Sequence, residues 1–104
     1  MTILESESAV AMRVQVTDEA VFVELQDGRT VTAPLSWYPR LRHGTPEERG
    51  IWELIGRGSG IHWPELDEDI SIASMLAGRP SAERQESLKR WLEKRRVPSH
   101  GLPT

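Results

Sequence analysis

The chain has 104 residues, of which 38% are hydrophobic and 28% are charged, a balance typical of one folded domain and too apolar for wholesale disorder. It has no cysteine, which excludes disulfides and thiolate chemistry, and it has no apolar run long enough to cross a bilayer. The net charge of −3 argues against a surface that is basic throughout. We therefore expect a single cytoplasmic domain with no membrane segment.

The N-terminal third of the sequence predicts a three-stranded antiparallel meander. Residues 1–11 carry no useful period and are expected to form a flexible leader. Apolar residues then alternate with polar ones over residues 12–16, 21–25 and 31–33, which is the pattern of half-buried strands.

The turn between the second and third expected strands decides which side chains face each other. A two-residue loop at 27–28 would place the valines of the second strand opposite threonines. A three-residue loop with a left-handed Gly28 instead pairs Val23 with Val31 and gathers the apolar residues on one face. We favour the three-residue loop, because a slip of one residue would invert every side chain.

The middle of the chain shows a strong helix start. Thr45 fits the N-cap, Pro46 the first helical position, and Glu48 the third position of a capping box. We expect this helix to end at Gly56 and to bury one apolar stripe. The stripe would consist of Ile51, Trp52, Leu54 and Ile55.

The remaining elements are expected to be short except for the last. Residues 61–63 read as a strand that Pro64 stops, and an acidic loop anchored by Leu66 and Ile70 should follow. Ser71 is expected to cap a short helix with Ile72, Met75 and Leu76 turned inward. A basic amphipathic helix is expected over residues 81–96, followed by a disordered tail at 97–104.

These elements predict an α+β fold with an N-terminal three-stranded antiparallel meander, short helices, a fourth short strand and a C-terminal helix. Three motifs point further: P-L-S-W-Y-P-R-L at 34–41, T-P-E-E-R at 45–49 and G-x-G-x-G-I-H-W-P-E-L-D-E-D-I-S at 56–71. Together they resemble the bacterial domain-of-unknown-function family numbered 2442, over residues 12–80. The resemblance implies a small α+β fold and no established catalytic residues.

The same resemblance implies a gene neighbourhood. Members are often encoded beside another small protein, in an arrangement similar to toxin–antitoxin pairs. Some relatives add a C-terminal helix-turn-helix, but the residues that follow Pro80 suffice for one helix only, so we do not carry that DNA-reading module over to this chain.

Two groups of polar or glycine residues in the centre of the chain have both a functional and a structural interpretation. The glycines at 56, 58 and 60 could cradle a phosphate, but they follow an expected helix and precede a strand, so a left-handed turn is favoured. His62 with Asp67 and Asp69 could hold a divalent metal or act as an acid–base pair. We interpret His62 instead as an outward-facing histidine bonded to a nearby carboxylate. We expect no catalytic, cofactor or metal site.

The aromatic residues divide into two groups. Trp37, Tyr38, Trp52 and Trp63 could form an aromatic binding surface, but three of them lie where the patterns point inward or at a helix start, so packing in the core is favoured. Trp91 lies on a helix with few apolar residues, where a large aromatic side chain often anchors a partner.

The C-terminal helix is therefore the candidate partner-binding element. The residues expected to make the contact are Leu88, Trp91, Arg90, Lys94 and Arg95. Its basic residues could also contact DNA phosphates, dock on an acidic protein, or remain solvated as expected at a helix C-terminus.

The sequence thus favours a non-enzymatic protein-interaction module, the antitoxin-like or regulatory partner of a small neighbouring protein. The exposed edge of the meander is a second candidate pairing surface. A DNA-binding regulator that uses the basic helix is the first alternative, and an enzyme or metal protein centred on His62 is the second. Homodimer formation stays open.

Overall fold

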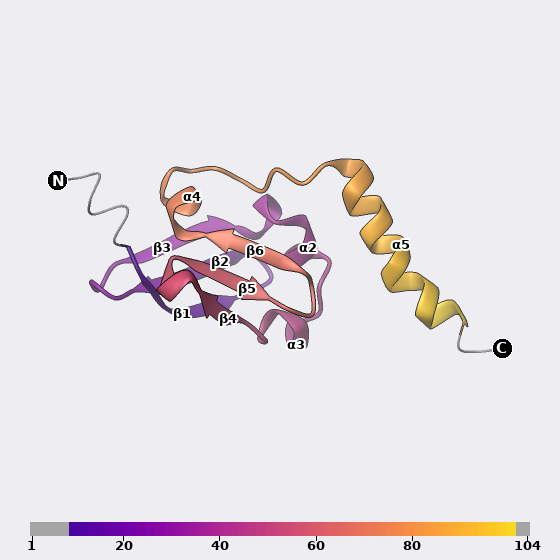
Figure 1. Ribbon diagram of the computed structural model, residues 1–104, viewed down its shortest axis with the longest axis horizontal. Helices are drawn as coiled ribbons and strands as arrows, with labels where there is room; N and C mark the ends of the chain where they lie inside the picture. Colours follow the sequence, from indigo (N-terminus) through magenta and orange to yellow (C-terminus); the bar gives the residue numbers. More distant parts are fainter. Residues whose placement is uncertain (1–8, 102–104) are drawn as a thin grey trace.

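The computed structural model describes the backbone of residues 9–101 and the side chains of residues 9–95 (Figure 1). Most of the expected leader and the end of the expected tail lie outside these residues. Two three-stranded antiparallel sheets, short helices and one long C-terminal helix form an α+β fold, as the sequence predicts.

The first sheet is the predicted meander. It contains β1 (Ala11–Val16), β2 (Ala20–Leu25) and β3 (Thr30–Pro34) in the order β1-β2-β3, with both pairs antiparallel. The alternation of apolar and polar residues predicts these strands correctly, because one face of the sheet is buried and the other is exposed.

The predicted register of the β2–β3 hairpin is also confirmed. Val23 pairs with Val31, and Gly28 has a φ of 96°, in the left-handed region. The Leu25 N–H donates to the Arg29 carbonyl at 2.8 Å, which closes the three-residue loop. The loop chemistry thus sets which face of β2 enters the core.

The helix predicted from Thr45 begins as expected but is much shorter. Helix α3 (Pro46–Arg49) has a complete capping box, in which the Thr45 hydroxyl accepts from the Glu48 N–H and the Glu48 carboxylate accepts from the Thr45 N–H. The chain then becomes extended as β4 (Glu53–Ile55). The prediction of a long helix ending at Gly56 was therefore wrong.

The expected buried stripe of that helix is also wrong for three of its four members. Ile51, Leu54 and Ile55 keep 47%, 38% and 39% of their surface exposed, and only Trp52 packs on the core. The reason is tertiary: Leu54 pairs with Ile61 of the next strand, so the backbone finds its hydrogen bonds in a sheet instead of a helix.

The second sheet has the order β4-β5-β6, with β5 (Gly60–Trp63) in the centre and β6 (Glu68–Ser71) at one edge. The strand predicted at 61–63 is confirmed, whereas the acidic stretch expected as an exposed loop contains a strand. Alternation in β6 turns Glu68 and Ile70 inward, opposite Trp63 and Ile61.

Short helices close the ends of the two sheets. They are η1 (Leu35–Trp37), α2 (Pro39–Arg42), η2 (Gly56–Gly58) and α4 (Ile72–Leu76). As predicted, the Ser71 hydroxyl caps α4 by accepting from the Ser74 N–H at 3.2 Å. Ile72 and Met75 are buried, as expected for the inward face of this helix.

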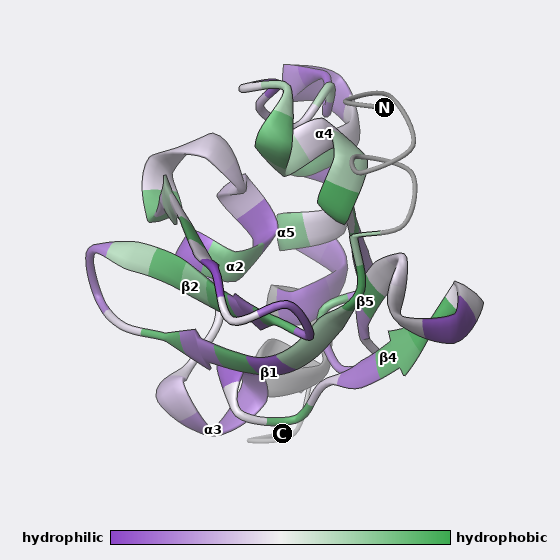
Figure 2. Cartoon of the chain, turned by 90° about the vertical axis from the view of Figure 1, so that its left-hand side faces the viewer, coloured by the Kyte–Doolittle hydropathy of each residue, from purple (hydrophilic) through white to green (hydrophobic). Residues whose placement is uncertain are grey.

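One hydrophobic core fills the space between the sheets. Seen from the N-terminal end, the sheets face each other, and β4 lies at the outer side of the molecule (Figure 2). Side chains of both sheets are fully buried in one cluster, among them Val21, Val23, Ile61 and Trp63. The predicted core aromatics are confirmed: Tyr38 and Trp63 are buried, and Trp37 and Trp52 pack against the cluster.

The last helix, α5 (Gln85–Gly101), projects from one end of the domain (Figure 1). It begins four residues after the predicted start at Ser81 and continues past residue 96. Within the described part of the chain, no helix has the length and apolar character needed to span a membrane.

We predict that Gly58→Ala destabilises the domain more than Gly28→Ala. Both positions have positive φ, so each substitution should cost roughly 1–2 kcal/mol of backbone strain. A Cβ at Gly28 would meet open space, whereas one at Gly58 would lie 2.5 Å from Val10 Cγ1 and 3.2 Å from the Ala11 carbonyl. That contact should add roughly 1–3 kcal/mol, measurable by urea unfolding. Equal losses would contradict this account.

Candidate interaction surface

Helix α5 is held on the domain by Trp91, whose ring contacts Arg40 of α2, while Arg95 of the same helix also lies over this ring. The guanidinium carbon of Arg40 lies 5.1 Å from the centre of the Trp91 ring, and that of Arg95 lies 4.8 Å from it. We call these three residues the tryptophan clamp. Each cation–π contact of this kind is worth about 0.5–2 kcal/mol. Trp91 also packs against the core cluster, so the clamp joins α5 to the hydrophobic interior.

Two bidentate ion pairs fix the arginines of the clamp. Arg40 donates to Glu83 at 2.6 and 2.9 Å, and Arg95 donates to Glu48 at 3.0 and 2.9 Å. The Arg40 and Glu83 side chains are only 14% and 9% exposed, so solvent screens this pair less than an ordinary surface pair. The hydrogen bond from Arg40 lowers the pKa of Glu83, and that from Arg95 lowers the pKa of Glu48.

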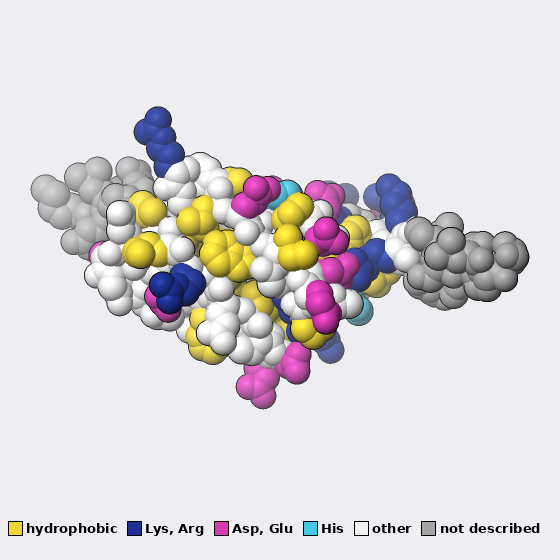
Figure 3. Space-filling view, turned by 90° about the horizontal axis from the view of Figure 1, so that it is seen from below, with side chains coloured by type: hydrophobic (Ala, Val, Ile, Leu, Met, Phe, Trp, Pro, Cys, Tyr) yellow, Lys and Arg dark blue, Asp and Glu magenta, His cyan; other side chains and the backbone are white. Residues whose placement is uncertain are grey.

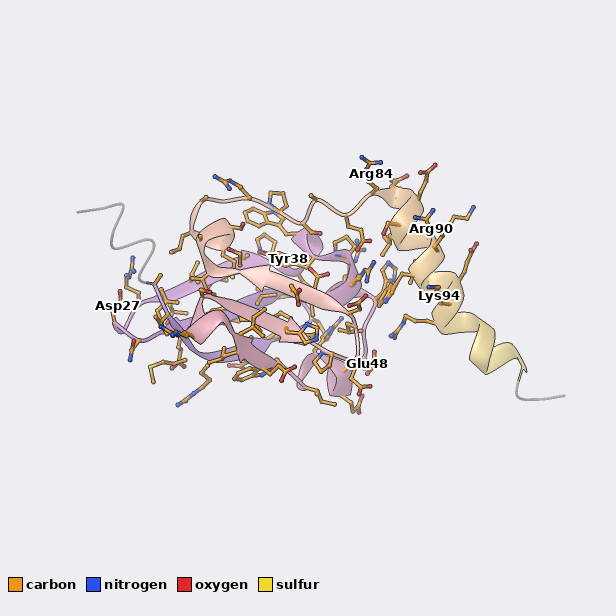
Figure 4. All side chains as sticks on the ribbon, in the orientation of Figure 1. Asp27, Tyr38, Glu48, Arg84, Arg90 and Lys94 are labelled. Atoms are coloured by element: carbon orange, nitrogen blue, oxygen red, sulfur yellow. The ribbon has the colours of Figure 1, made fainter. Side chains whose placement is uncertain are left out.

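The structure divides the five residues expected to bind a partner. Trp91 contacts Arg40, and Arg95 bonds to Glu48, so both side chains already have partners within their own chain. Arg90 and Lys94 are exposed along α5 (Figure 4). Leu88 is half-buried and, with Leu92, lines a shallow groove of about 360 Å³ along one side of the helix.

A second surface, which sequence reasoning missed, lies along the edge strand β4. Ile51, Leu54 and Ile55 are all exposed on or just before this strand. The view from below shows hydrophobic side chains gathered over the face on which β1 and β4 lie (Figure 3). A usable signal was present, because two short apolar segments joined by a glycine-rich turn also fit a hairpin.

His62 behaves as the sequence predicts. It lies on the outer face of β5, and its Nδ1 is 2.5 Å from Asp69 Oδ1 of the neighbouring strand. The hydrogen bond to Asp69 raises the pKa of His62, and the charge of Glu53 on β4 adds to the effect. Asp67 points elsewhere, toward Arg40, so His62, Asp67 and Asp69 do not converge on a metal site. Among the described residues, no group of three potential ligands meets.

The glycine-rich turn is a structural element between two strands. Gly56 and Gly58 take positive φ in the single 3-10 turn η2, which joins β4 to β5 without leading into an α-helix. A phosphate-binding turn usually leads from a strand into a helix N-terminus. The left-handed turn favoured from the sequence is therefore confirmed.

The features above define a small α+β domain with a clamped basic helix and an exposed apolar edge. The chain belongs to the family described as protein of unknown function DUF2442, which matches residues 11–81. The resemblance found in the three sequence motifs is thereby confirmed. No curated protein matches the chain.

Two solved structures have a similar fold. A crystal structure of a protein of unknown function from Rhodospirillum rubrum has a TM-score of 0.64 and 26% identity, over 73% of this chain and 94% of that protein. A solution structure of an uncharacterised protein from Chromobacterium violaceum has a TM-score of 0.65 and 23% identity, over 78% of this chain and 76% of that protein.

We predict that Trp91→Ala releases α5 and leaves the domain folded. An isolated helix of this length is marginal in water, so removal of the clamp should reduce amide-exchange protection in residues 85–95 about tenfold or more. Protection in β5 should not change. Leu92→Ala is the control, because Leu92 lies on the same helix outside the clamp. Equal loss of protection in both variants would refute the clamp.

We also predict that NMR titration places the pKa of His62 above its ordinary value of 6.5. Because the folded value is raised, the pair stabilises the fold below pH 6.5 and loses this effect as the pH rises through the folded pKa. Asp69→Asn should lower the pKa of His62 more than Asp67→Asn does, since Asp69 is the hydrogen-bond partner. The reverse order would show that the pair does not form.

Proposed function

We propose that the protein is a non-enzymatic protein-interaction module, and that it acts as the antitoxin-like or regulatory partner of a small neighbouring protein. The observation that carries this proposal is the exposed apolar edge at β4. The family resemblance supports the choice of partner, because its members are often encoded beside another small protein. A homodimer formed through the same edge is the competing outcome.

The chemistry of the β4 edge suits the docking of a strand or an apolar surface. Covering the exposed parts of Ile51, Leu54 and Ile55 would contribute roughly 2–4 kcal/mol in total. β4 is at the end of its sheet, and among residues 9–101 it pairs with β5 alone, so one row of its backbone groups can accept a partner strand. Such pairing gives affinity through the backbone and specificity through the side chains.

Helix α5 supplies a second contact region. Leu88 and Leu92 line its shallow groove, and Arg90 and Lys94 are exposed along the same helix. The lining of the groove also includes Glu86 and Lys89, so it suits a partner segment whose apolar residues are flanked by charges of both signs. The clamp keeps the helix ordered before binding, which reduces the entropy lost on association.

The charges on the same helix make a role as a DNA-binding regulator the less favoured proposal. Glu86 and Glu93 are exposed on the same helix and offset part of its positive charge, and Arg95 is paired with Glu48. Phosphate binding needs several uncompensated cations, because its affinity comes from released counterions. DNA binding that weakens steeply with added salt would reverse this ranking.

We predict that Leu54→Glu weakens binding to the protein encoded by the adjacent gene about tenfold or more, since a charge would be placed in the apolar contact. Calorimetry on the purified pair measures the change, and light scattering separates a heterodimer from a homodimer. Phe22→Glu is the matched control, because Phe22 is 36% exposed, close to the 38% of Leu54, but lies on the meander.

The control should keep its affinity within about twofold, as expected for a substitution outside the interface. Leu88→Glu tests the helix in the same assay and should have a smaller effect than Leu54→Glu. A complex that tolerates both Leu54→Glu and Leu88→Glu would contradict the proposed surfaces. Loss of folding is checked by circular dichroism for each variant.

A further inference from the structure

The inner face of the second sheet carries a row of apolar side chains that ends at β4. Ile70 of β6 stands opposite Ile61 of β5, and Ile61 stands opposite Leu54 of β4. The two isoleucines are 4% and 0% exposed, whereas Leu54 is 38% exposed, because β4 lies at the outer side of the molecule (Figure 2). An apolar residue on a further strand would continue this row and cover Leu54.

The outer face of the same sheet carries a polar row that also ends at β4. Asp69 of β6 stands opposite His62, and His62 stands opposite Glu53 of β4. The hydrogen bond with Asp69 has the largest effect in raising the pKa of His62, and the charge of Glu53 adds to it. Glu53 is exposed, and it takes part in none of the ion pairs found among the side chains of residues 9–95. The row thus ends in a carboxylate that a cation on a further strand can pair with.

Ile55 adds an apolar contact next to these two rows. It stands opposite Gly60, where an added Cβ would lie 3.2 Å from Ile55 Cγ1. The Ile55 side chain therefore lies against the backbone of β5 on the outer face, and 39% of its surface stays exposed. Along the edge, β4 presents a carboxylate, a leucine and an isoleucine in that order.

We propose that the partner docks at β4 through an antiparallel strand with a lysine or arginine opposite Glu53, followed by apolar residues opposite Leu54 and Ile55. This inference rests on the proposed function, because it names the chemistry of the strand that pairs there. Opposite charges on facing positions stabilise a strand pair, and so do facing apolar residues. The antiparallel direction is the one that both pairs of this sheet already use, and it is slightly more stable per residue.

A second copy of this chain fits the edge less well. Facing residues in a sheet point to the same side, so antiparallel pairing of two β4 strands places Glu53 opposite either Glu53 or Ile55 of the other copy. The first register sets two carboxylates against each other, and the second sets each carboxylate against an apolar side chain. A register that reached Arg57 would need Gly56 and Arg57 in extended form, whereas both have a φ of 58°. The edge therefore favours a strand of different sequence.

The test is an NMR titration of the full-length protein with two short hairpin peptides, each closed by an Asn-Gly turn that keeps the probe strand extended. The probe strand reads Lys-Val-Val in one peptide and Glu-Val-Val in the other. Amide shifts should change at residues 53–55. At low ionic strength the lysine peptide should bind about threefold tighter or more, because only its charge complements Glu53.

Glu53→Lys should reverse this preference, so that the glutamate peptide binds about threefold tighter. Glu24→Lys is the matched control, since Glu24 is an exposed carboxylate on β2 and its replacement changes the net charge equally. The control should keep the preference of the wild type. Circular dichroism checks that both variants fold.

Two results would overturn this inference and leave the proposed function standing. They are equal affinity of the wild type for both peptides, and a preference that Glu53→Lys does not reverse. The calorimetric effect of Leu54→Glu tests the proposed function separately, because it changes a different side chain. The absence of shifts at residues 53–55 with either peptide would exclude strand pairing at this edge. A dimer in light scattering that Leu54→Glu separates would assign the edge to a second copy instead.

Discussion

Arg49 joins the two halves of this domain, and it does so from a buried position. Its guanidinium donates to the Leu41 carbonyl at 2.8 Å, to the Arg42 carbonyl at 2.9 Å and to Asp18 at 3.0 Å. Its own carbonyl accepts from the Trp63 indole at 3.0 Å. A buried cation is costly unless its donors are satisfied, so these bonds oblige the β1–β2 turn, α2 and the second sheet to meet at one point.

Arginine side chains with satisfied hydrogen-bond donors also connect α5 to the domain. Arg40 and Arg95 each combine a bidentate carboxylate bond with a contact to the face of Trp91. Arginine suits both roles, because its planar group can stack on an aromatic ring while it donates in two directions. The C-terminal helix is therefore positioned by directed contacts, although its own apolar surface is small. This explains how a thinly apolar helix can stay ordered beside a compact core.

The candidate functional surfaces lie around this framework at separate places. The β4 edge presents apolar side chains where the sheet ends, and the groove of α5 presents Leu88 and Leu92. An open pocket lined by Glu68 and Tyr38 lies beside the link that leads from α4 toward the tryptophan clamp. Burial raises the pKa of Glu68 to about 7, and the charge of Glu83, which bonds to Arg40 of the tryptophan clamp, adds to this effect.

Local chemistry let the sequence by itself determine the meander, the Gly28 register and the cap at Thr45, because each depends on residues a few positions apart. The outward-facing histidine followed from strand alternation in the same way. Only the tertiary structure decided that Leu54 lies in an exposed edge strand, that Glu68 is buried and that Trp91 contacts Arg40 of the distant helix α2. These outcomes depend on partners far away in sequence, and a local pattern cannot identify which distant segment supplies them.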